Sequence, residues 1–122
     1  MGFNEKVHAF IAAKFYVYLT EAFGERGERA FIHGTQYYAE QRGRRMAQRA
    51  IRDGKELTYA NYLEYGEWVN TQEIIDEGCA NKSTIESWAP DYRIHITMCP
   101  WYTQFKEMGL PDAGHVYCAH LD

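Results

Sequence analysis

The spacing of the hydrophobic residues changes about halfway along the chain, and this change limits the folds that the chain can adopt. Residues 4–68 carry apolar side chains at the period of an amphipathic helix. In residues 69–98 apolar and polar side chains tend instead to alternate, which is the pattern of a strand with one buried face. The alternation is clearest in a final strand where one face is apolar and the other polar: Tyr92, Ile94, Ile96 and Met98 against Arg93, His95 and Thr97.

Three helices are predicted in the first part of the chain. The first covers residues 4–23, where Asn4 is a suitable N-cap, and the second covers residues 28–52. Thr58 can cap the free amides of a third helix over residues 59–68. The apolar repeat of the first helix consists of Val7, Phe10, Ile11, Phe15, Leu19 and Phe23.

Three strands and two short helices are predicted after the helical part. The strands cover residues 69–77, 82–88 and 92–98 and are expected to form an antiparallel meander. One short helix ends at Met108, and a last helical stretch runs from Asp112 to the end of the chain. We therefore expect an α+β fold, with N-terminal helices packed on a small antiparallel sheet and short C-terminal helices, in a single domain over residues 1–122.

Composition narrows the classes of function. The formal net charge of −4 argues against a nucleic-acid surface, and no apolar segment is long enough to span a membrane. The chain has 3 cysteines and no secretory signal pattern, so a disulfide framework is not expected. The sequence thus predicts a cytoplasmic protein with reduced thiols that are available for reaction or for metal binding.

Cys99 is the most informative candidate for chemistry. It follows the last strand and precedes Pro100, a residue that favours the first position of a helix. A thiol at a helix N-terminus is close to free backbone amides and to the positive end of the helix dipole, and both stabilise the reactive thiolate. The alternative is a small buried hydrophobic residue at the end of a strand.

Three more polar residues are spaced three and four apart near the end of the chain. A helix would place His115, Cys118 and Asp122 on one face. With Cys99 they could ligate zinc, or they could act as nucleophile, base and orienting acid. The sequence contains no paired metal motif, so metal binding is the weaker of the two interpretations.

The polar face of the last strand leads towards Cys99. On it, Arg93 could bind a carboxylate through two parallel hydrogen bonds, and His95 could transfer a proton. The alternative is an ordinary solvated sheet face. His8, His33 and His120 have no polar constellation around them in the sequence and are assigned no role.

Several short segments together resemble one protein family. They are the stretch 97–101 (Thr-Met-Cys-Pro-Trp), Met108-Gly109, Tyr117-Cys118 and Asp122, together with a helix over residues 38–48 that contains Glu40, Arg42, Gly43 and Arg44. This pattern resembles the L-2-amino-thiazoline-4-carboxylic acid hydrolases. The resemblance implies a hydrolase that opens a small carboxylated heterocycle at a C=N bond, that is, a cyclic amidine.

The resemblance also implies roles for individual residues. Cys99, Cys118 and Asp122 belong to the motif and are the expected catalytic residues. Spacing alone, and not the motif, indicates His115 or His95 as the acid–base group. Trp101 and Tyr117 of the motif are expected to contact the substrate, and so, from its place on the last strand, is Arg93. Members of the family usually continue beyond the Asp. We therefore expect a missing C-terminal segment, a shortened member of the family, or a homo- or hetero-oligomer that completes the site.

The alternative function is a non-catalytic module. The aromatic residues and the Cys/His positions would also suit a protein that holds a small ligand, a metal or a haem, or an accessory subunit. No cofactor is required by the hydrolase interpretation, and zinc is the metal that the four candidate ligands would favour.

Overall fold

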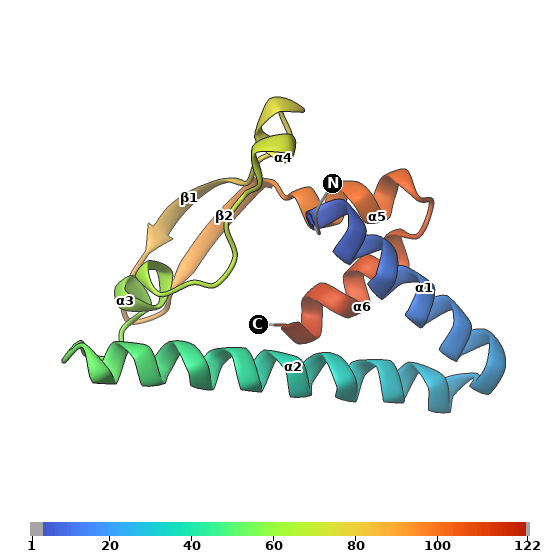
Figure 1. The fold of residues 1–122 in the computed structure, drawn as a ribbon, viewed down its shortest axis with the longest axis horizontal. Helices are drawn as coiled ribbons and strands as arrows, with labels where there is room; N and C mark the ends of the chain where they lie inside the picture. The colour runs from blue at the N-terminus through green and yellow to red at the C-terminus, as the bar shows by residue number, and fades with distance from the viewer. Residues whose placement is uncertain (1–3, 122) are drawn as a thin grey trace.

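The computed structural model describes residues 4–121 and confirms the α+β class (Figure 1). Helices dominate, and the sheet is one antiparallel hairpin of two strands. In chain order the elements are α1 (Glu5–Phe23), α2 (Glu25–Arg52), α3 (Tyr59–Glu64), α4 (Gln72–Asp76), β1 (Lys82–Ser87), β2 (Arg93–Met98), α5 (Pro100–Glu107) and α6 (Pro111–Leu121).

The core lies where α1, α2, α5 and α6 meet. Phe105 of α5 is completely buried at its centre, and Gly114 of α6 lets the two short helices approach closely, since a Cβ there would lie 2.9 Å from Phe105. The hydrophobic side chains of α1 that are fully buried in this core are alanines, and the half-buried Tyr16 and Leu19 pack against it. The buried cluster consists of Ala9, Ala12, Ala13, Phe31, Phe105, Ala113 and Tyr117.

The buried face of α1 differs from the one that its apolar repeat predicted. Phe10, Ile11 and Phe15 are 52%, 40% and 60% exposed, although periodicity indicated them as the core-facing positions. The physical reason is the close approach of three helices, which leaves room for alanine but not for aromatic side chains. The helix itself was predicted correctly, and so was its N-cap, because the Asn4 side chain accepts a hydrogen bond from the Val7 amide.

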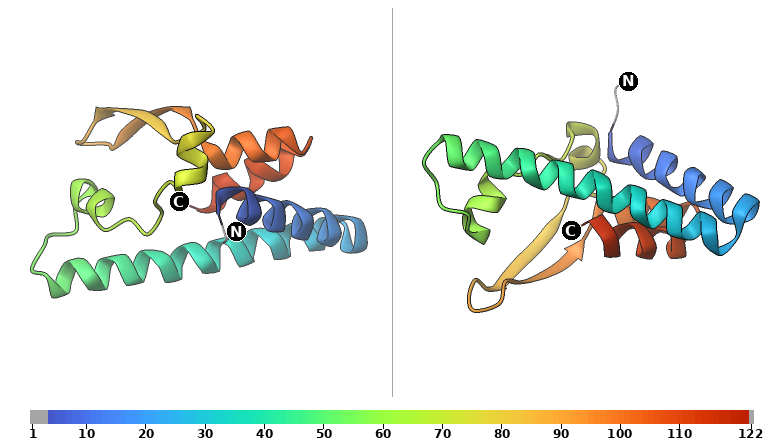
Figure 2. Two further views of the ribbon diagram at one scale, coloured as in Figure 1. Left: turned by 45° about the horizontal axis from the view of Figure 1, so that its top comes forward. Right: turned by 90° about the horizontal axis from the view of Figure 1, so that it is seen from below.

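The predicted strand over residues 69–77 is wrong. This segment contains α4, whose N-cap Thr71 accepts a hydrogen bond from the Ile74 amide through its side chain. Ile74 is completely buried. One turn of helix lets Thr71 cap the Ile74 amide while the Ile74 side chain packs inside the protein. The meander is therefore reduced to β1 and β2, whose register pairs Ile85 with Ile94. The hairpin and α2 lie on opposite sides of the molecule (Figure 2).

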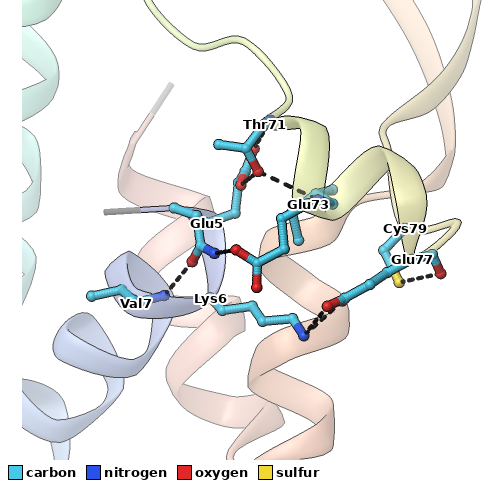
Figure 3. A network of polar contacts seen from close by, with 9 residues as sticks. Glu5, Lys6, Val7, Thr71, Glu73, Glu77 and Cys79 are labelled. Atoms are coloured by element: carbon cyan, nitrogen blue, oxygen red, sulfur yellow. Dashed lines mark hydrogen bonds and ion pairs between the residues drawn. The ribbon is translucent and has the colours of Figure 1, made fainter. Parts of the chain in front are cut away.

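A polar network fastens α4 to the start of α1 (Figure 3). The carboxylate of Glu5, only 2% exposed, accepts hydrogen bonds from the Thr71 amide at 2.9 Å and the Thr71 hydroxyl at 2.8 Å. Nearby, Lys6 forms an ion pair with Glu77 at 2.6 Å. A buried carboxylate needs such partners, so Glu5 fixes the chain that leads from α3 into the hairpin.

Glycine substitutions in α2 test the close approach of α1 and α2. A Cβ at Gly27 would lie 1.8 Å from the Leu19 carbonyl oxygen, which is backbone and cannot turn away. We expect Gly27→Ala to reduce the free energy of unfolding by about 3 kcal/mol or more, measured by urea denaturation. At Gly34 of the same helix, a Cβ would have no atom within 4 Å, so Gly34→Ala should instead stabilise the protein by up to about 1 kcal/mol. Equal effects of the two substitutions would contradict this packing.

Candidate functional site

An open groove of about 2390 Å³ lies between α2, the hairpin and the C-terminal helices. Side chains of α2, α5, α6 and the hairpin line it, so elements from both ends of the chain contribute to it. The apolar hairpin residues Ile85, Ile94 and Ile96 face the groove. A cavity of this kind, apolar with a few polar groups, is the usual form of a small-molecule site.

The most specific polar contact in the groove joins the two ends of the chain. The Nε2 atom of His8 lies 2.8 Å from the hydroxyl of Tyr117, and the Trp101 ring meets the His8 ring edge-on at 4.4 Å. Tyr117 is only 6% exposed and belongs to the core, so the position of its hydroxyl is well defined. Burial lowers the pKa of the half-buried His8 below its ordinary 6.5, and the imidazole is therefore neutral near pH 7.

Trp68 extends the aromatic wall of the groove. The centroid of its ring lies 6.0 Å from that of the Trp101 ring. The residue before it, Glu67, is bound to α2. Arg45 donates two hydrogen bonds to Glu67, at 2.8 and 3.1 Å, and Arg49 adds an ion pair at 3.3 Å. These contacts lower the pKa of Glu67, first through the hydrogen bond from Arg45. The arginines of α2 thus anchor the loop that carries Trp68.

Two buried donors on the groove have no acceptor in the described part of the chain. They are the indole Nε1 of Trp68 and the hydroxyl of Tyr92. Buried polar groups are normally hydrogen-bonded, and an unpaired one lowers stability unless something else pairs with it. A bound molecule with an acceptor atom beside either group would satisfy that group.

Cys99 lies at the N-cap of α5, as the sequence predicted for this segment. Its carbonyl accepts hydrogen bonds from the amide and the hydroxyl of Thr103, at 3.0 and 2.9 Å, and its half-buried side chain lines the groove. His115 and Cys118 line the same groove from α6, both exposed, and the His115 ring meets Tyr102 edge-on at 5.6 Å.

The other predicted residues differ in where they lie: two are outside the groove, two line it, and one is outside the described residues. Arg93, whose side chain is 69% exposed, is 3.9 Å from Asp91, and neither it nor His95 is among the groove-lining residues. Trp101 and Tyr117, predicted to contact substrate, do line the groove. Asp122 is outside the described residues.

Comparison with known proteins gives one match, and it covers nearly the whole chain. Residues 4–122 match the profile of the L-2-amino-thiazoline-4-carboxylic acid hydrolases. The chain belongs to this hydrolase family. Comparisons with curated proteins and with solved structures find no significant match.

The described residues of this hydrolase family member form no metal-binding cluster. Within residues 4–121, no three histidine, cysteine, aspartate or glutamate side chains gather closely enough to hold a metal ion. Cys99, His115 and Cys118 share the groove without forming such a cluster. No described helix of the chain is long and apolar enough to cross a membrane.

His8 is the groove residue that sequence reasoning missed. It lies within the apolar repeat of α1, 109 residues away from Tyr117, and no neighbouring residue in the sequence indicates a catalytic role for it. The available signal was weak: a lone polar residue on the helix face that carries Ala9, Ala12 and Ala13. Its partners become apparent only when α1 packs beside α5 and α6.

The lowered pKa of His8 predicts how stability depends on pH. Below pH 6.5 the unfolded chain takes up a proton on this residue before the folded protein does, so the His8 contribution is complete above that pH and decreases as the pH falls. We expect the free energy of unfolding to fall from about pH 7.5 to about pH 5, measured by urea denaturation. The His8→Gln variant should lose this part of the dependence, whereas Tyr117→Phe, which keeps the ring that buries His8, should retain it. A wild-type profile that coincides with that of His8→Gln would contradict the burial of the imidazole.

Proposed function

We propose that this protein is a hydrolase that opens a small, carboxylated cyclic amidine in the groove between α2, the hairpin and α6. The observation that carries the proposal is the neutral His8, hydrogen-bonded to Tyr117 beside Trp101, in a groove that also contains the thiols of Cys99 and Cys118. Membership of the hydrolase family supports the reaction class. The flat aromatic wall suits a small planar ring.

The proposed chemistry begins at Cys99. Its sulfur adds to the amidine carbon of a thiazoline ring, the carbon–sulfur bond of the ring breaks, and the released sulfur takes the proton that the Cys99 thiol gives up. Water then adds to the same carbon and Cys99 leaves. One proton of the water returns to the Cys99 sulfur and the other goes to nitrogen, so the product is an N-carbamoyl cysteine.

His8 is proposed as the acid–base group for these proton transfers. A neutral imidazole can accept a proton from the thiol or from water and return it to the leaving sulfur. The pKa of His8 is lowered by burial, which keeps the base form available at neutral pH. Trp101 follows Cys99 by two residues and touches His8, so the helix start that carries the thiol adjoins the imidazole.

The substrate's carboxylate is proposed to pair with the unsatisfied indole donor of Trp68, whose ring lies beside Trp101. This assignment differs from the sequence-based expectation for Arg93, whose exposed guanidinium is near Asp91. His115 and Cys118 are proposed to contact the ring from α6, where they line the groove. Since the three cysteines form no disulfide, we place the enzyme in a reducing, cytoplasmic environment.

Turnover of 2-amino-thiazoline-4-carboxylate tests the nucleophile. The assay follows formation of N-carbamoyl cysteine by chromatography and mass spectrometry, with purified wild type and variants. We expect Cys99→Ser to lower kcat by at least about a thousandfold, because the nucleophile is lost. The matched control is Cys79→Ser, since Cys79 lies outside the groove-lining set and its thiol donates to the Glu77 carbonyl at 3.7 Å. Wild-type turnover that survives in Cys99→Ser would remove Cys99 from the mechanism.

The same assay tests His8 through its pH profile. We expect His8→Gln to lower kcat/KM by about a hundredfold or more. In the wild type the acidic limb of kcat/KM should lie below pH 6.5, because burial lowers the pKa of the base. His33→Gln, at an exposed α2 position on the rim of the same groove, is the control and should retain activity. An acidic limb that remains in His8→Gln would assign the base to another residue.

A further inference from the structure

The outward face of α1 is apolar, although it faces away from the core. Four large side chains on it are more than a third exposed: Phe10 at 52%, Ile11 at 40%, Phe15 at 60% and Tyr18 at 65%. The opposite face of the same helix is occupied by buried alanines. A helix that is apolar on all sides is normally covered on all sides, and an exposed apolar patch of this kind marks an interaction surface.

The exposed residues follow the spacing of a helix-pairing seam. Ile11, Phe15, Tyr18 and Ala22 are separated by four, three and four positions, which is the alternation of a and d positions in a coiled coil. Lys14 and Glu21 lie one position before Phe15 and Ala22, and both are exposed. They therefore occupy equivalent flanking positions, two turns apart, with opposite charges.

From this pattern we propose that α1 pairs with α1 of a second copy of the chain, antiparallel about a twofold axis between Phe15 and Tyr18. In this arrangement Phe15 of one copy packs on Tyr18 of the other, and the large Ile11 faces the small Ala22. Lys14 of each copy meets Glu21 of the other, so the two ion pairs are reciprocal. A parallel arrangement would instead bring Lys14 towards the position of Leu19, which carries no charge. The charges thus select the antiparallel pair.

This surface is independent of the proposed function. α1 of 19 residues is about 28 Å long, enough for two such ion pairs and a central aromatic cluster. One helix pair is a small interface, so we expect a dimer with a Kd on the order of micromolar.

Charge exchange tests the pairing with the full-length protein in sedimentation-equilibrium experiments. In a dimer of Lys14→Glu, both reciprocal pairs bring together two acidic residues, 14 of one copy and 21 of the other. In a dimer of Glu21→Lys, both pairs bring together two basic residues. We expect each variant alone to dimerise about tenfold more weakly than the wild type. An equimolar mixture of the two variants should recover wild-type association, because every pair then joins opposite charges again. Lys55→Glu, an exposed change of the same charge beyond α2, is the control and should dimerise normally.

A second pair of variants tests the apolar seam. Phe15→Ala should weaken dimerisation, whereas Tyr37→Ala, which removes a 67% exposed aromatic side chain from α2, should not. Circular dichroism checks that each variant is folded. The proposal is overturned if the wild type is monomeric at about 100 times the expected Kd, or if the mixture of charge variants associates no better than each alone. Binding of the wild-type monomer to phosphatidylglycerol vesicles, with loss of binding in Phe15→Ala, would assign the face to a lipid surface instead.

Discussion

The helical part of the protein depends on the small side chains that α1 presents to its neighbours. Ala9 and Ala13 are completely buried, and they allow α2, α5 and α6 to approach the α1 backbone closely. Phe105 fills the remaining space and meets the backbone of α6 at Gly114. Larger side chains at these positions would separate the helices, because a packed interior has no free volume into which they could move.

This packing also determines the geometry of the groove. Tyr117 is a member of the core cluster, and its hydroxyl extends from the core to His8. The imidazole and the Trp101 ring are therefore held by the most tightly packed part of the molecule. The opposite wall is different, since the hairpin and the Trp68 loop are held by surface contacts such as the Glu67 ion pairs. The two walls of the groove are thus held by different means, one by core packing and the other by polar surface contacts.

The same choice of residues leaves α1 with two functional faces. Alanines occupy the inner face, and Phe15 and Tyr18 are directed outwards, where they belong to the seam that we assign to a second copy. His8 lies between these faces and reaches the groove. The packing of the core, the position of His8, which we propose as the acid–base group, and the proposed association therefore all depend on α1.

The amino-acid sequence by itself determined the local structure. Hydrophobic period and caps predicted α1, most of α2, the hairpin strands and the α5 helix beginning after Cys99, because these depend on residues close together in the chain. The motif around Cys99 and Tyr117 indicated the family and several residues that line the groove.

Only the tertiary structure decided the rest. It determined that α1 buries Ala9, Ala12 and Ala13 rather than Phe10 and Phe15. It also determined that Thr71, bound to the buried Glu5, begins a helix and not a strand, and that His8 contacts Tyr117. Each of these outcomes depends on the volume or the hydrogen-bonding partner that a distant segment provides. A local pattern does not contain that information, since the residues in question are 66 and 109 positions apart.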